Sequence, residues 1–111
     1  MEEDYVKVTE GKDIPPSQMK EVEVNGEKIC IANVEGKYYA IGNVCTHLGG
    51  PLAQGKLEGY EVQCPWHGSR FDIRTGKVAR PPAMRSEPTF DIRVEEDDII
   101  LLKKRANYDQ S

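Results

Sequence analysis

The chain has 111 residues, which is enough for one domain and leaves no room for a second sizeable core. Fifteen Lys and Arg against nineteen Asp and Glu give a formal net charge of −4 at pH 7, a balance that does not favour nucleic acid or an anionic membrane surface as a partner. Hydrophobic residues make up 38% of the chain, which is typical of a soluble globular protein with a modest core.

The cysteine count and the N-terminus indicate a reducing compartment. Three cysteines exclude a closed disulfide framework, because one thiol would be left over. The first residues, Met1 to Asp4, are acidic and contain no apolar signal segment, and the longest apolar run, 99–102, is far shorter than the ~18 residues of a membrane span. We therefore expect a cytoplasmic protein with no membrane partner.

The N-terminal third is typical of strands joined by turns. Apolar residues alternate with polar ones, the period of a half-buried strand, at Val6 and Val8 and again at Val22 and Val24. Between these pairs, residues 14–20 are expected to form one short turn of helix after two prolines.

Two residue pairs predict tight hairpin turns. Asn25-Gly26 tolerates positive φ and leads into a β-branched run at 28–34. Glu35-Gly36 leads into a further apolar segment at 38–41.

The C-terminal part predicts strands as well. Apolar residues alternate from Phe90 to Val94, an acidic turn is expected at 95–98, and a closing strand is expected at 99–103. Residues 106–111 are expected to fray. Together with the N-terminal strands, this pattern predicts an all-β fold.

The middle of the chain, 42–83, has a different composition. It holds seven of the ten Gly, four of the seven Pro and both His, with only short apolar stretches. Such a segment cannot pack a large core of its own. It predicts a hairpin with elaborated loops, inserted into a β scaffold that holds the loops in place.

Four of the five Cys and His residues lie in this middle segment. Cys45 and His47 form one group, and Cys64 and His67 form a second group after sixteen intervening residues. Each group offers one thiolate and one imidazole, so two neighbouring loops would present the donor set of a metal site. An isolated Cys or His is usually an ordinary core residue, but that explanation is improbable for two groups in matching order.

The choice of metal depends on how the ligands are paired. Tetrahedral Cys2His2 coordination suits structural zinc, but zinc sites usually pair like ligands on each loop. Here each loop is mixed, which a dinuclear centre explains better, since each loop can send its Cys to one iron and its His to the other. A structural zinc module that binds protein is kept as an alternative.

The residues around these groups resemble the two cluster-binding loops of Rieske iron–sulfur proteins. The matching segments are Cys45-Thr46-His47-Leu48-Gly49-Gly50 and Cys64-Pro65-Trp66-His67-Gly68-Ser69, and the likeness extends to 70–72, 75–78 and 81–82. It implies the Rieske fold over a single domain, 1–111, with an antiparallel β base and a cluster-binding subdomain at 43–84. It also implies one 2Fe-2S cluster per chain, with two His replacing two Cys on one iron.

The resemblance implies a role for each ligand. Cys45 and Cys64 would bind the buried iron, and His47 and His67 would bind the outer iron. The electron would therefore leave at the imidazole edge.

The resemblance also implies supporting positions around the cluster. Three glycines would let backbone N–H groups approach the sulfurs, although each alone could be an ordinary turn glycine. Ser69 would hydrogen-bond a bridging sulfide, and Pro81 would belong to a shielding proline loop. Trp66 is expected to pack over the apolar surroundings of the cluster, with gating of the electron path or a place in a docking face as the alternatives. The complete set of expected supporting residues is Leu48, Gly49, Gly50, Trp66, Gly68, Ser69 and Pro81.

Departures from the high-potential branch of the family predict a lower potential. Gly50 and Trp66 stand where that branch has two disulfide-bonded cysteines, and Phe71 stands where it has a tyrosine that donates a hydrogen bond. Fewer hydrogen bonds to sulfur stabilise the extra electron less, so we expect the lower half of the range of about −150 to +300 mV.

Cys30 and the charged segment 65–86 lie outside the ligand set. Cys30 lies in a β-branched run and is expected to be a core residue. The segment 65–86 contains five cations and one Asp, so a dipolar protein with an acidic partner is one interpretation, and a solvated loop without a partner is the other.

These observations predict a one-electron carrier and no catalysis by this chain alone. The resemblance implies a flavin-containing reductase as donor and a terminal oxygenase or another redox enzyme as acceptor. We expect the carrier to be a monomer. The alternative from another class is a Rieske-like small subunit of an enzyme complex, such as an assimilatory nitrite reductase.

Overall fold

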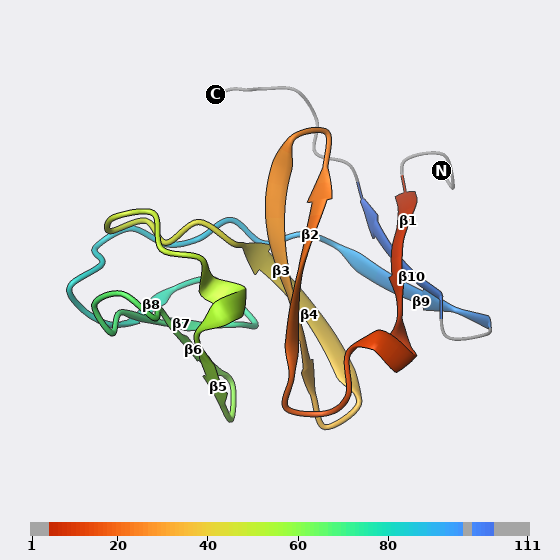
Figure 1. Cartoon of the computed structure of the whole chain (residues 1–111), viewed down its shortest axis with the longest axis horizontal. Helices are drawn as coiled ribbons and strands as arrows, with labels where there is room; N and C mark the ends of the chain where they lie inside the picture. The colour runs from red at the N-terminus through yellow and green to blue at the C-terminus, as the bar shows by residue number, and fades with distance from the viewer. Residues whose placement is uncertain (1–4, 97–98, 104–111) are drawn as a thin grey trace.

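The computed structural model describes residues 5–96 and 99–103, and these form three antiparallel sheets (Figure 1). The first sheet has the order β1 (Tyr5–Glu10), β10 (Ile99–Lys103) and β9 (Ile92–Glu95). The second has the order β2 (Met19–Val24), β3 (Glu27–Val34) and β4 (Lys37–Gly42). The third contains β5 (Lys56–Glu58), β6 (Glu61–Gln63), β7 (Arg70–Asp72) and β8 (Val78–Arg80). The all-β prediction is confirmed.

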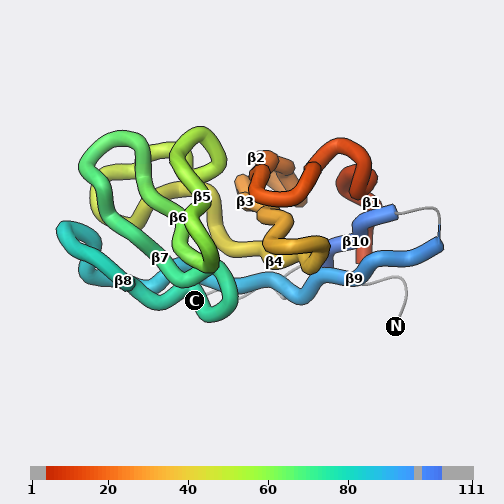
Figure 2. Tube along the Cα trace, turned by 90° about the horizontal axis from the view of Figure 1, so that it is seen from below, coloured from red at the N-terminus to blue at the C-terminus, as the bar shows by residue number. Residues whose placement is uncertain are grey.

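The first two sheets form the base of the molecule, and the third lies at the other end (Figures 1 and 2). The two expected turns produce the regular β2–β3–β4 meander. Asn25 and Gly26 have φ values of 53° and 81°, the left-handed conformations that a two-residue hairpin turn of this type needs. Glu35 and Gly36, with φ values of 55° and 92°, have left-handed conformations as well and form the turn between β3 and β4.

Strand β3 is buried on both faces and joins the two cores of the protein. Ile29 and Ile31 belong to the base core, which also contains Ile100 and Leu102 of β10. Cys30, the residue between them, points into a second core that extends under the third sheet. The period of two along a strand therefore lets one β-branched run support the base on one face and the loop region on the other.

The third sheet is a larger structure than the sequence suggested. The middle segment was expected to be a hairpin with elaborated loops, but it contains four short strands and the 3-10 helix η3 (Leu52–Gln54). Alternate burial marks its inner face, since Val62 of β6 and Phe71 of β7 are directly paired and fully buried. The subdomain boundary at 43–84 stays a prediction.

The expected helix at 14–20 is wrong. The helical turn lies earlier, in η2 (Gly11–Asp13), and the following residues form a turn in which Gln18 N–H donates to Pro15 C=O. Ser17 has a φ of 69°, which a right-handed helix does not allow, and its N–H pairs with Asn33 C=O of β3. Pairing with the neighbouring strand replaces the local helical bonds.

Two further expectations concern residues that the structure does not describe. The expected acidic turn falls partly on 97–98 and the expected fraying tail falls on 106–111, and these positions lie outside the described residues. Among the residues described, no helix has the length and apolar character needed to cross a membrane.

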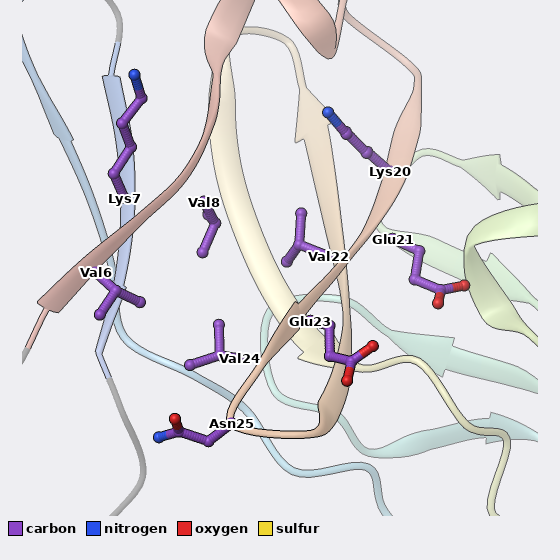
Figure 3. A pocket seen from close by; sticks show the side chains of 9 residues that line it. All are labelled: Val6, Lys7, Val8, Lys20, Glu21, Val22, Glu23, Val24 and Asn25. Atoms are coloured by element: carbon purple, nitrogen blue, oxygen red, sulfur yellow. The ribbon is translucent and has the colours of Figure 1, made fainter.

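A groove of about 470 Å³ separates β1 from β2, which are the edge strands of the two base sheets (Figure 3). Val8, Val22 and Val24 lie between the strands, and Lys7 and Lys20 lie at its rim. The groove belongs to the base and is lined by neither Cys nor His.

Candidate metal centre

Two loops at the end of the molecule remote from β1 have the same backbone framework. In the first loop, 45–50, Cys45 N–H donates to Gly50 C=O and Gly49 N–H donates to Cys45 C=O, both at 2.8 Å. In the second loop, 64–69, Cys64 N–H donates to the carbonyl of residue 69 at 2.8 Å and Gly68 N–H returns to Cys64 C=O at 3.2 Å. Each cysteine therefore begins a closed knuckle of identical length.

A glycine at the fifth position of each knuckle closes it. Gly49 and Gly68 have φ values of 83° and 81°, in the left-handed region that other residues rarely adopt. Their N–H groups make the return bonds to the cysteine carbonyls. The sequence indicated both glycines, and the structure gives each a backbone role at its loop.

The two cysteine thiols lie inside the molecule. Cys45 and Cys64 are each 3% exposed, are not disulfide-bonded and belong to the same core. Burial raises the pKa of the Cys45 thiol, the neighbouring Cys64 adds to the rise, and the backbone N–H groups of His47 and Leu48 oppose it by hydrogen bonding. Leu48, an expected supporting residue, therefore contributes its backbone, while its side chain is exposed.

The two imidazoles lie outward of the thiols. The rings of His47 and His67 have their centroids 5.2 Å apart and cross at 84°. His47 is partly exposed and His67 is exposed. The four expected ligands thus form two like pairs, with sulfur inside and nitrogen at the surface.

This arrangement fits a dinuclear iron–sulfur group. Burial raises the pKa of the Cys45 thiol, so two adjacent buried thiols become thiolates only when a cation compensates their charge, as an iron ion does. The backbone N–H groups beside Cys45 are the donors that stabilise a metal-bound sulfur. Among the described residues no three Cys, His, Asp or Glu side chains gather about one point suited to a single ion.

Gly50 and Trp66 bring the two loops into contact. A Cβ atom on Gly50 would lie 2.6 Å from Cys64 Sγ and 3.1 Å from Trp66 Cδ2, so only glycine fits. The indole ring is 57% exposed and rests against the backbone of the first loop. These are the two positions where a bracing disulfide was expected to be missing, and aromatic packing against backbone now fills that place.

A third loop, 81–86, closes over the other two. Ala83 N–H donates to Ser69 Oγ at 2.9 Å, and Thr46 Oγ1 donates to Arg85 C=O at 2.7 Å. Ser69 is fully buried, and because its oxygen accepts from Ala83 its own hydroxyl hydrogen is free to donate, so its expected hydrogen bond to a sulfide stays a prediction. Pro81 precedes these anchoring points and is exposed, so its expected shielding role stays a prediction.

Sequence reasoning missed three residues that hold this end together. Thr46 was seen only as the spacer in Cys-x-His. Asn43 is buried, accepts from Ala53 N–H at 2.8 Å and donates to Glu21 at 3.0 Å, which ties the first loop to β2. A buried side chain, Glu87, follows the third loop. Asn43 stands next to the motif, but no spacing in the sequence distinguishes Glu87 from an exposed carboxylate.

Glu87 lies at the junction of the base and the loops. It is 4% exposed, its Oε2 atom has no hydrogen-bond partner, and its N–H bonds to Gly76 C=O. Burial raises the pKa of Glu87 to about 7, although a hydrogen bond from the Thr46 backbone opposes the rise. The carboxyl group is therefore poised to lose its proton near neutral pH.

Cys30 lies in the core, as its β-branched surroundings predict. It is fully buried, and burial raises the pKa of its thiol to about 12.

Two of the five cations in 65–86 form ion pairs. Arg70 pairs with Glu58 and Glu61 at 2.8 and 3.3 Å, and Arg74 pairs with Asp72 at 3.0 Å. These two arginines are therefore neutralised within the third sheet.

The sequence of this chain is similar to a known family and to known proteins. A family model described as the Rieske 2Fe-2S domain matches residues 4–96. The ferredoxin component of naphthalene 1,2-dioxygenase/salicylate 5-hydroxylase systems from Ralstonia sp is 39% identical over 89 residues, which cover 80% of this chain and 86% of that protein.

Solved structures agree with this match. The ferredoxin of carbazole 1,9a-dioxygenase from Nocardioides aromaticivorans IC177 has a TM-score of 0.87 at 27% identity, covering 91% of this chain and 98% of that one. A chain in the complex of reduced oxygenase and oxidized ferredoxin of carbazole 1,9a-dioxygenase has a TM-score of 0.85 at 26% identity, covering 95% and 98%.

Proposed function

This chain belongs to the Rieske 2Fe-2S family, and we propose that it is a ferredoxin that carries single electrons from a flavin-containing reductase to a terminal oxygenase. Relatives named as ferredoxin components of dioxygenase systems, over nearly their full length, support the assignment as a carrier rather than a catalyst. A similar ferredoxin in complex with its oxygenase supports the choice of acceptor.

The observation that carries the proposal is the arrangement of the four ligands. Cys45 and Cys64 would hold the inner iron from within the core, and His47 and His67 would hold the outer iron at the surface. When bound, a Rieske cluster takes up and gives up one electron at a time. An acceptor that touches the imidazole edge would be separated from the cluster by one ring only.

The surrounding residues keep this site dry on one side and open on the other. The two closed knuckles fix the cysteine backbones, and the core beneath them excludes water from the thiols. The third loop holds Ser69 in place through Ala83, and the Ser69 hydroxyl hydrogen would donate to a sulfur of the bound cluster.

The proposal extends to the state of the protein. We take the carrier to be a monomer in the cytoplasm that binds its partners in turn, and not a fixed subunit of one enzyme complex. Sedimentation of the purified protein and co-purification from its native cells would separate these arrangements, since a fixed subunit would stay with a large chain.

The decisive experiment is an analysis of the purified, anaerobically prepared protein. We expect about two irons and two acid-labile sulfides per chain, a rhombic electron paramagnetic resonance signal after reduction, and uptake of about one electron per chain. One zinc and no sulfide would contradict the proposal and favour the zinc module.

A ligand variant tests the outer iron. His67→Cys should keep the cluster but lower its potential, because a thiolate stabilises the oxidised iron more than a neutral imidazole does. Trp66→Phe, at the neighbouring position, is the matched control and should leave the resonance signal in place. An unchanged signal and potential in His67→Cys would show that His67 is not a ligand.

A further inference from the structure

The face of the molecule around the two imidazoles combines apolar side chains with positive charge. It is formed by the three loops, which lie at the same end of the molecule in Figure 1, and we name it the imidazole face. Among the described residues, six large hydrophobic side chains are exposed, and four of them belong to this face: Val44, Leu48, Trp66 and Met84. Such a concentration at one end is typical of a surface that a partner covers.

Three cations surround this face. Arg80 precedes the third loop, Arg85 lies within it, and Lys56 lines the pocket beside Trp66 and Gly68. None of the three takes part in an ion pair between residues that the structure describes. Arg70 and Arg74, by contrast, are occupied by carboxylates within the third sheet.

Carboxylates are missing from the same face. The segments 44–50, 64–69 and 80–86 contain no Asp or Glu. Glu27 and Lys28 border the first loop together and offset each other in charge. The remaining neighbour, Glu87, is buried, and burial raises its pKa to about 7, which reduces its negative charge near neutral pH.

The rest of the chain has the opposite charge. Among the residues that the structure describes, three of the thirteen Lys and Arg and none of the thirteen Asp and Glu belong to the imidazole face, which leaves ten cations against thirteen carboxylates on the other described residues. The longest dimension of the molecule is 38 Å, several times the Debye length of about 10 Å at 0.1 M salt. A partner arriving at the imidazole face therefore senses the local positive charge and not the net charge of −4.

Resting on the proposed carrier function, we propose that the redox partner of this protein meets the imidazole face with a surface rich in carboxylates. The partner is a protein whose acidic groups surround an apolar centre, so that Arg80, Arg85 and Lys56 steer it while Leu48, Trp66 and Met84 are covered. The positive charge around the imidazole face comes from Arg80, Arg85 and Lys56. It determines which oxygenases and reductases the carrier can serve, because a partner with a basic docking surface would be repelled.

Small inorganic oxidants test the sign of the charge without the natural partner. The holoprotein is reduced and then reoxidised in a stopped-flow instrument by hexacyanoferrate(III), an anion, or by tris(phenanthroline)cobalt(III), a cation. We expect the anion to react about threefold more slowly when the salt concentration rises from about 50 mM to about 500 mM, and the cation to react faster. The net charge alone predicts the reverse for both.

Matched charge reversals locate the effect. Arg80→Glu with Arg85→Glu should invert both salt dependences. Lys7→Glu with Lys12→Glu changes the net charge by the same amount in the base and should leave them as they are. A wild-type salt dependence that follows the net charge, or equal effects of the two double variants, would overturn the proposal.

Two controls separate the possible failures. Iron, sulfide and resonance measurements come first, so that loss of the proposed carrier function is seen as a missing cluster before any rate is measured. Sedimentation at low salt shows whether the acidic base of a second copy occupies the face. A self-associated protein that shields the face would also overturn the proposal, because the occupant would then be the chain itself.

Discussion

The base and the cluster end of this protein are stabilised in different ways. The base consists of two three-stranded sheets packed around a core of mostly aliphatic side chains. The cluster end has strands of three residues each, and its loops are held by single hydrogen bonds, by glycine fit and by the ligands themselves. The base therefore depends on apolar burial alone, whereas the cluster end combines the apolar core under the third sheet with a bound group.

The difference is clearest in the three cysteines. Cys30 on β3 and the two proposed ligand cysteines share one core, and all are nearly inaccessible to solvent. Cys30 lies in a regular strand, whereas Cys45 and Cys64 each begin a knuckle, and backbone N–H groups of the first knuckle turn toward the Cys45 sulfur. Local backbone geometry, and not burial, distinguishes a ligand from a packing residue here.

The largest effect should come from removing one buried ligand. Cys64→Ala should abolish the cluster, with iron per chain falling from about two to nearly none, because the inner iron loses half of its protein ligands. Cys30→Ala, in the same core, should keep the cluster. Iron analysis and visible absorbance distinguish the two variants.

The same variant tests how independent the two regions are. If the base is stabilised by its own core, Cys64→Ala should retain the far-ultraviolet circular dichroism of the strands and a cooperative unfolding transition. Complete unfolding of Cys64→Ala would show that the cluster also stabilises the base, and the comparison of the two regions would fail.

Sequence reasoning predicted the base and the ligand loops for physical reasons that operate over short distances. The turns at Asn25-Gly26 and Glu35-Gly36 are local, so their strands could be recognised from residue types alone. The ligand pattern is also local to each loop. The wrong helix at 14–20 and the underestimated third sheet both depend on pairing with distant strands, which local propensity does not contain.

Long-range contacts explain the residues that sequence reasoning missed. Thr46 and Arg85 are 39 positions apart, and their hydrogen bond exists only once the third loop has closed. Glu87 gave no signal, since a glutamate before a proline is ordinarily an exposed loop residue. Its burial follows from the meeting of Gly42 and Gly76, where any larger residue would collide with residue 87.

A second variant should weaken the base without touching the cluster. Ile31→Ala removes a fully buried side chain from the face of β3 that packs in the base core, and should reduce the free energy of unfolding by about 2–5 kcal/mol. The resonance signal of the folded protein should stay unchanged. Chemical denaturation followed by circular dichroism measures the first effect, and a shifted resonance signal would show that the two regions are coupled through β3.

A third variant should act in the opposite way, on the cluster end. Gly50→Ala places a methyl group 2.6 Å from Cys64 Sγ, which forces the two loops apart and should cost about 1–3 kcal/mol of local stability. We expect faster loss of iron to a chelator. Gly59→Ala is the control, because its φ of 59° makes an alanine locally strained while nothing lies within 4 Å of the added Cβ atom, so backbone strain without a steric clash should not speed the loss of iron. Equal iron loss from both variants would contradict the steric argument.

The smallest effect concerns Glu87, at the boundary between the two regions. Burial raises the pKa of Glu87 from an ordinary 4.5 to about 7, so between these values the folded protein holds a proton that the unfolded chain has released. The stability contribution is therefore fully present below pH 4.5 and is lost as the pH rises through about 7. Glu87→Gln, which stays neutral, should match the wild type near pH 5 and be more stable on the order of 1–2 kcal/mol near pH 8.

Thermal unfolding across this pH range measures the difference between the two proteins. Glu23→Gln, an exposed carboxylate on the edge strand β2, is the control for loss of one negative charge, and its difference from the wild type should stay flat with pH. A flat difference for Glu87→Gln would mean that water reaches the carboxylate and removes the cost of its charge. If the stability difference between Glu87→Gln and the wild type rises with pH, Glu87 titrates at the junction of the two regions. The pH would then act on the contact between the base and the cluster end, and not on either region alone.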